Sequence, residues 1–337
     1  MPTLLVASAG GHLEQLWNLR PRLEGIDDDC TWLTYDTPQS RSLLRHEQRI
    51  FIPTAGPRDA RVAITHTRMA LHVLGLGGWR TAVSTGALPS VPFLTLGRAR
   101  GVDCHFIDSA TRVQGPSLSG SMLARVPGIA LYSQYRWADH PGWEYRGSVF
   151  DRYASETVTP RPIRRAVVTL GTIGYGFDRL VRAAQAVLPP EVEVLWQLGH
   201  TAMGAELRGA RPFVPAHDLR SAMAEADVVI CHAGVGSALT AFEAGRCPII
   251  VPRRRACQEH IDDHQAQLAA ELAGRGLAIA VEADQLTPEV LADAAARGVV
   301  VDEDPPPFVL GRGSGHRPSR AAARRSPAPA SSRSAAA

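Results

Sequence analysis

Residues 226–265 read ADVVICHAGVGSALTAFEAGRCPIIVPRRRACQEHIDDHQ, and this stretch decides the fold. Its start, residues 227–232, is a short apolar run rich in β-branched residues, which predicts a strand buried on both faces of a parallel sheet. A glycine turn follows, and then an apolar pattern with helical spacing that stops at Gly245. In parallel α/β sheets, ligands bind beyond the carboxyl ends of such strands.

The turn after this strand suits a phosphate group. Ser237 can cap the following helix, and the first backbone N–H groups would point with the helix dipole toward an anion. Glu243 lies about two turns further on, where a carboxylate could accept hydrogen bonds from a ribose diol. Chain reversal alone, or a merely solvated glutamate, would explain either feature by itself. Together they favour a nucleotide site.

A polar cluster follows the next predicted strand, residues 248–252. It runs from His260 to Gln265, includes Asp263 and His264, and lies immediately before a predicted helix at residues 266–272. Carboxylate, imidazole and amide groups at this density could hold sugar hydroxyls.

Residues 167–282 resemble the donor-binding half of family 28 glycosyltransferases. They are more similar still to the small catalytic subunits of two-part transferases that act on dolichyl or undecaprenyl diphosphate sugars. The matching features are HAGxGS, an EAG-containing helix, a strand ending in VP, and DDHQ, in this order. The resemblance implies donor binding by Gly171, Thr172, His232, Gly234, Gly236, Ser237, Glu243, Asp263, His264 and Gln265.

The N-terminal half carries a second glycine turn. Residues 3–8 predict a buried strand, and Gly10, Gly11 and His12 enter a helix. These residues are compatible with phosphate binding and equally with a tight turn in which His12 caps the helix. Further strands and helices are expected to alternate, which predicts a mainly parallel sheet with crossover helices. The expected strands are residues 31–35, 49–52, 82–84, 105–108 and 129–132, and the expected helices are 59–76 and 91–100.

This half resembles the membrane-associated partner subunit of the same two-part transferases. The matching segments are SAGGHL from Ser8, STGA from Ser84, FIDSATR ending at Arg112, and PSLSG from Pro116. The resemblance implies a natural fusion, with Gly10, Gly11 and Arg112 binding the acceptor. The usual glutamate of the partner's E-S-x-x-R motif is Asp108 here, and the partner's N-terminal membrane helix is not seen.

The chain is therefore expected to have an α/β, GT-B fold, with two Rossmann-like domains facing a cleft. The predicted parts are an N-terminal acceptor domain (1–154), a linker (155–165), a C-terminal nucleotide-sugar domain (166–304) and a disordered tail (305–337).

The resemblance implies an inverting transfer of a sugar from a UDP-sugar to a polyprenyl-diphosphate-linked saccharide. N-acetylglucosamine is the expected sugar, with glucose and glucuronate as alternatives. His12 is the candidate base, because imidazole accepts a proton near neutral pH. Neither a metal nor a cofactor is expected. A UDP-N-acetylglucosamine 2-epimerase and a non-catalytic scaffold that recruits a transferase to the membrane remain alternatives.

Composition and charge limit the classes of binding partner that we expect. The formal charge of +3 becomes −3 without six arginines of the tail, so a nucleic-acid partner is not expected. Five scattered cysteines without a C-x-x-C pair favour reduced thiols in the cytoplasm. Neither a signal peptide nor a membrane span is expected. The amphipathic residues 62–79 could lie on an anionic bilayer, at the inner face of the plasma membrane, or pack on the sheet.

Overall fold

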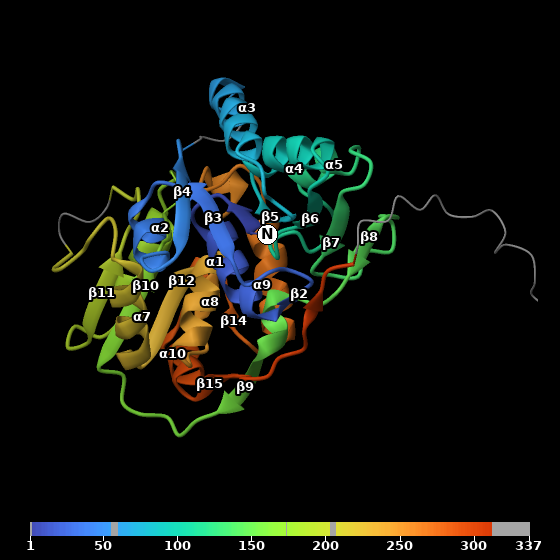
Figure 1. The fold of residues 1–337 in the computed structure, drawn as a ribbon. Helices are drawn as coiled ribbons and strands as arrows, with labels where there is room; N and C mark the ends of the chain where they lie inside the picture. The colour runs from blue at the N-terminus through green and yellow to red at the C-terminus, as the bar shows by residue number, and fades with distance from the viewer. Residues whose placement is uncertain (1, 55–59, 173, 203–206, 312–337) are drawn as a thin grey trace, which may run out of the picture.

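The computed structural model describes residues 2–54, 60–172, 174–202 and 207–311. Its N-terminal sheet has seven strands in the order β4-β3-β1-β5-β6-β7-β8 (Figure 1). Every neighbouring pair is parallel, as predicted. The strands are β1 (Thr3–Ala7), β3 (Cys30–Tyr35), β4 (Gln48–Ile52), β5 (Thr81–Gly86), β6 (Asp103–Ile107), β7 (Ala130–Ser133) and β8 (Trp143–Tyr145). The helices are α1 (Gly11–Leu19), α2 (Pro38–Leu43), α3 (Ala60–Gly75), α4 (Ser90–Ala99) and α5 (Leu118–Leu123).

The C-terminal sheet has five parallel strands in the order β11-β10-β12-β13-β14. The strand predicted first, β12, lies at its centre and is almost fully buried, as its apolar run requires. The strands are β10 (Arg165–Thr169), β11 (Glu193–Gln197), β12 (Val228–His232), β13 (Ile249–Val251) and β14 (Ile279–Ala280). The helices are α6 (Asp178–Val187), α7 (Ala216–Glu225), α8 (Val235–Glu243), α9 (His264–Gly274) and α10 (Pro288–Ala295).

The two domains share a hydrophobic core. Leu13 and Leu16 of α1 are buried in one cluster with Leu239 and Phe242 of α8. Figure 1 shows these two helices side by side between the sheets. Only part of the boundary between the domains is therefore open to solvent.

The linker between the two domains is shorter than predicted. Strand β9 (Tyr153–Thr157) pairs antiparallel with β15 (Arg297–Val301), so the first residues of the predicted linker 155–165 are part of a strand. The backbone N–H of Val299 in β15 donates to the carbonyl of Gly245, just after α8. Strand β9 is thereby fixed to the C-terminal domain, which its sequence position did not indicate.

The predicted disorder from residue 305 is wrong for residues 305–311. Strand β16 (Phe308–Val309) pairs in parallel with β2 (Leu23–Glu24), so the chain returns to the N-terminal domain. Phe308 is fully buried and its ring lies 5.6 Å from that of Tyr132. Leu310 is buried in the same cluster, so these two side chains anchor a segment whose composition is typical of a disordered tail. The rest of the predicted tail, residues 312–337, lies outside the described residues.

Helix α3 packs one face on the domain. Ala70, Val73 and Leu74 are buried, whereas Ile64 and Leu71 are exposed. Packing on the domain thus accounts for some of the apolar residues of this helix, whereas others remain exposed to solvent. Within the described ranges, no helix combines the length and apolar character that crossing a membrane requires.

Candidate active site

The start of α8 presents free backbone amides. Gly234 is the N-cap, and Ala238 is the first residue whose N–H bonds back to it. The prediction that Ser237 caps this helix is wrong, because the helix begins two residues earlier and the Ser237 hydroxyl lies 3.5 Å from Nδ1 of His232. The N–H groups of Val235, Gly236 and Ser237 have no partner within the helix. Such amides at a helix start can bind an anion, and the phosphate site at this turn stays a prediction.

Gly171 and His232 pack together behind these amides. Gly171 has φ +72°, and a Cβ there would lie 2.4 Å from Cε1 of His232. Only glycine therefore lets the loop after β10 lie on the imidazole. Burial, reinforced by the charge of Arg253, lowers the pKa of His232 to about 3, so this ring is neutral. Thr172, next in the loop, is exposed.

The first turn of α1 meets the first turn of α8. A Cβ on Gly236 would lie 3.4 Å from Cα of Gly11, so the two glycines bring both helix starts together. The N–H of Gly10 donates to Oε1 of Gln39 at 2.7 Å. Two helix N-termini converge here, and each carries partial positive charge.

His12 has a fixed tautomer. Its Nδ1 lies 2.8 Å from the carbonyl oxygen of Thr85, which can only accept, so Nδ1 carries the proton and Nε2 keeps its lone pair. Burial lowers the pKa of His12, and nearby Arg112 lowers it further. The N-cap of α1 is Gly10, so the capping alternative for His12 is wrong. A neutral imidazole with a free Nε2 can accept a proton.

An interdomain cleft of about 390 Å³ brings together predicted residues from both halves. Nη1 of Arg112 lies 3.9 Å from Oδ2 of Asp262, and Gln267 donates to Gln114 across the cleft at 3.1 Å. The lining from the N-terminal domain is Arg112, Gln114, Gly115, Pro116 and His140, and that from the C-terminal domain is Asp262, Asp263, His264 and Gln267.

Asp262 organises the polar cluster, although it was not among the residues predicted to bind the donor. Its Oδ1 contacts Nδ1 of His264 and lies 3.0 Å from Nδ1 of His260. These three side chains are of metal-ligating types, and their ligand atoms lie within 4.8 Å of one another. The hydrogen bond between His264 and the Asp262 carboxylate, and that from the backbone N–H of Asp262 to Nδ1 of His260, hold this geometry. Burial lowers the pKa of His264 to about 4.

Gln265 is not brought into the cleft. Its Oε1 accepts the backbone N–H of Arg253 at 3.0 Å, and its side chain is buried. Arg253 is itself only 1% exposed, and its guanidinium donates to the carbonyls of Leu170 and Gly176, both at 2.8 Å. This arginine ties together the loops behind the cleft. The run of arginines in the sequence did not show which one is buried.

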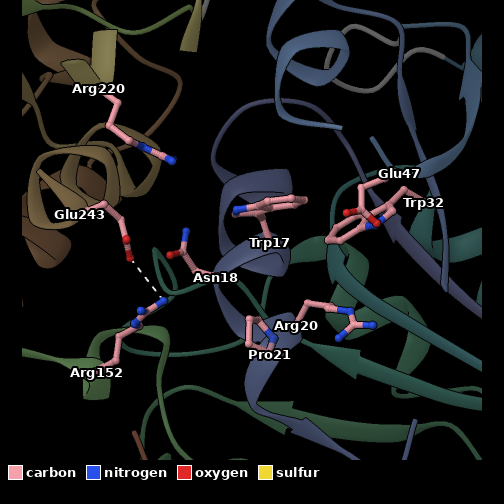
Figure 2. Close-up of a pocket in the computed structure, with 9 residues that line it drawn as sticks. All are labelled: Trp17, Asn18, Arg20, Pro21, Trp32, Glu47, Arg152, Arg220 and Glu243. Carbon is pink, nitrogen blue, oxygen red and sulfur yellow. Dashed lines mark hydrogen bonds and ion pairs between the residues drawn. The ribbon is translucent and has the colours of Figure 1, made fainter. Parts of the chain in front are cut away.

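Glu243 lies apart from the cleft and lines a second cavity of about 280 Å³ (Figure 2). Its Oε1 accepts from the hydroxyl of Tyr153 at 2.5 Å and lies 3.4 Å from Nη1 of Arg152. The two cavities have no lining residue in common. Glu243 therefore lines a different cavity from Asp263 and His264, although all three were predicted to bind the donor. The residues around the second cavity are Trp17, Asn18, Arg20, Pro21, Trp32, Glu47, Arg152, Arg220 and Glu243.

Comparison with known proteins supports the C-terminal prediction. Residues 166–299 match the glycosyltransferase family 28 C-terminal domain. A UDP-N-acetylglucosamine--N-acetylmuramyl-(pentapeptide) pyrophosphoryl-undecaprenol N-acetylglucosamine transferase of Ralstonia nicotianae is 33% identical over 147 residues, which are 39% of this chain and 39% of that protein. Its namesake in Stutzerimonas stutzeri is 34% identical over 152 residues, 41% of this chain and 39% of the relative. The chain thus matches about two fifths of the length of these relatives.

Solved structures show the same architecture over most of the chain. MurG of Acinetobacter baumannii has a TM-score of 0.52 and 19% identity, covering 87% of this chain and 89% of that one. The glycosyltransferase SnogD from Streptomyces nogalater has a TM-score of 0.54 and 18% identity, covering 88% and 92%. At these identities the likeness shows the fold alone. Residues 166–299 are therefore a glycosyltransferase family 28 C-terminal domain, and the two Rossmann-like domains of the chain have the GT-B fold.

Proposed function

We propose that this protein is an inverting glycosyltransferase that moves a sugar from a UDP-sugar to a polyprenyl-diphosphate-linked saccharide. The observation that carries the proposal is the cleft in which Arg112 of one domain faces Asp262, Asp263 and His264 of the other. The relatives named above use UDP-N-acetylglucosamine and an undecaprenol-linked acceptor by their names. N-acetylglucosamine is therefore the proposed sugar.

The donor would use the C-terminal domain. Its diphosphate suits the free amides at the start of α8, and its sugar hydroxyls suit Asp263 and His264 in the cleft. Glu243 lies about 9 Å further along α8 than Ser237, so a nucleoside that follows the helix would reach it. Gly11 covers part of this helix face in the structure. Donor binding would therefore separate α1 from α8.

The acceptor would use the N-terminal domain. A guanidinium matches phosphate oxygens, so Arg112 suits the acceptor diphosphate. Nε2 of His12 would take the proton from the acceptor hydroxyl as that oxygen attacks the anomeric carbon from the face opposite UDP. The bond to UDP then breaks, and the helix amides stabilise the leaving diphosphate. A single displacement of this kind inverts the anomeric centre.

A polyprenyl acceptor requires contact with a membrane surface. Figure 1 shows α3 and α5 at the same end of the N-terminal domain. Both helices expose large apolar side chains, and peripheral binding at the cytoplasmic face of the membrane would bury them. These side chains are Ile64, Leu71, Leu118 and Met122.

The test is UDP release by the purified full chain, with each UDP-sugar in turn, with and without an undecaprenyl-diphosphate-linked saccharide. The proposal predicts acceptor-dependent release that His12→Ala abolishes. His46→Ala is the matched control, because this histidine is exposed and outside the cleft. UDP release that does not depend on the acceptor would favour the epimerase or hydrolysis of the UDP-sugar. Binding of the UDP-sugar without UDP release would favour the scaffold.

A further inference from the structure

The carboxylate of Glu243 is held by one oxygen only. Oε1 contacts both the Tyr153 hydroxyl and the Arg152 guanidinium. Among the described residues, Oε2 has no hydrogen-bonding partner, and the side chain remains 21% exposed. Figure 2 shows this carboxylate at the edge of the second cavity, with Arg152 on one side and Arg220 on the other. One oxygen is anchored and the other is available to a ligand.

The environment of Tyr153 favours hydrogen-bond donation from its hydroxyl to this carboxylate. Its side chain is buried, and its ring packs 5.2 Å from that of Phe242, the neighbour of Glu243 in α8. Burial raises the pKa of the Tyr153 phenol, and the charge of Glu243 raises it further, so the hydroxyl keeps its proton. The same hydroxyl lies 3.1 Å from Oδ1 of Asn18 in α1.

The backbone fixes Tyr153 to the domain that carries Glu243. Tyr153 opposes Val301 in the β9–β15 pair, and β15 is joined to the end of α8 through Val299 and Gly245. Asn18, by contrast, belongs to the N-terminal domain. If α1 moves away when a nucleotide binds, the contact with Asn18 breaks and the contact with Glu243 persists.

We propose that Tyr153 is a positioning residue for the nucleoside of the donor. Its hydroxyl, together with Arg152, holds Oε1 of Glu243 so that Oε2 faces the cavity and accepts a hydrogen bond from a ribose hydroxyl. This inference rests on the proposed function, because it assumes that a ribonucleotide enters the cavity. It assigns a role to a side chain 90 positions away from Glu243.

Isothermal titration of the full chain with UDP, 2′-deoxy-UDP and 3′-deoxy-UDP tests the inference. The wild type is expected to bind UDP more tightly than at least one deoxy analogue. Tyr153→Phe is expected to weaken UDP binding about tenfold, the scale of one hydrogen bond to a charged group, and to reduce that preference. A purely structural loss would weaken all three ligands equally and would contradict the inference.

Two further variants make the result specific. In a Glu243→Gln background, Tyr153→Phe is expected to have little further effect, because both changes act on one contact. Tyr135→Phe is the matched control, since its buried hydroxyl donates to the carbonyl of Ala110 at 2.6 Å. It should leave UDP affinity unchanged.

The outcomes separate this inference from the function on which it rests. If the wild type binds no UDP, both fail. If it binds UDP and Tyr153→Phe retains the same affinity and ribose preference, only the positioning role is overturned. If Tyr153→Phe does not fold, Arg152→Met removes the other partner of Oε1. Arg152→Met must then weaken UDP binding and reduce the preference for UDP over its deoxy analogues. A variant that did neither would overturn the role.

Discussion

Phe308→Ala tests whether the return of the chain to the N-terminal domain stabilises the fold. Phe308 has no exposed surface and lies in the shared core, where its ring meets Tyr132 edge-on at 75°. The backbone bond from Leu310 to Glu24 does not depend on this side chain. The substitution therefore removes packing and leaves the strand pairing possible.

The expected cost is large. Truncating a fully buried phenylalanine lowers the free energy of unfolding by about 3–5 kcal/mol, through lost apolar burial and the cavity left behind. Val309→Ala is the control, because Val309 is adjacent in β16 but 42% exposed. Its effect should stay within about 0.5 kcal/mol.

Urea unfolding followed by circular dichroism measures both variants. The account predicts a lower midpoint for Phe308→Ala with an unchanged slope, and a near wild-type midpoint for Val309→Ala. Equal midpoints for the two variants would refute the reasoning that residues 305–311 are anchored in the core.

Five other predictions follow from the site. In His12→Ala, kcat should fall by about 10²–10⁴-fold, the usual contribution of a general base, in an acceptor-dependent assay. In the wild type, kcat/KM should hold as pH falls through 6.5 and drop only at the lowered pKa of His12, whereas a profile that breaks at or above 6.5 would contradict the assignment. Gly86→Ala should reduce kcat and also lower the midpoint of thermal unfolding, since Gly86 has φ +123° and its Cβ would lie 2.8 Å from Cε1 of His12. Arg253→Met should lower the free energy of unfolding by at least about 1–3 kcal/mol in urea, because buried carbonyls lose their donor. His232 and His264 are neutral when folded and take up protons when unfolded, so unfolding measured from pH 6.5 down to about 4 should show stability falling with pH.

The sequence predicted the features that depend on local patterns. The β-branched run ending at His232 gave the central strand of the second sheet, and the alternation of strands and helices gave two parallel sheets. The turns at Gly11 and Gly236 were correctly placed at helix starts, because in each case a glycine turn separates an apolar run from a helical pattern. Arg112, Asp263 and His264 were expected at the cleft from the resemblance, and the structure brings them together there.

The features that the sequence did not predict depend on contacts between distant segments. Glu243 finds Tyr153 only after β9 pairs with β15, and no spacing in the sequence encodes that pair. Gly234, rather than Ser237, caps α8 because the helix begins at Val235, two residues before the serine. Phe308 and Leu310 are apolar anchors in a segment whose composition is otherwise that of a disordered tail.

The most direct test of the proposed function is mass spectrometry of the acceptor. An undecaprenyl-diphosphate-linked saccharide is incubated with UDP-N-acetylglucosamine and the full chain, or with its His12→Ala variant. The account predicts that wild-type protein adds one N-acetylhexosamine per acceptor, with one UDP released for each, and that the variant adds almost none. An unchanged acceptor beside consumed or epimerised UDP-sugar would contradict the claim that this chain is a glycosyltransferase for a lipid-linked acceptor.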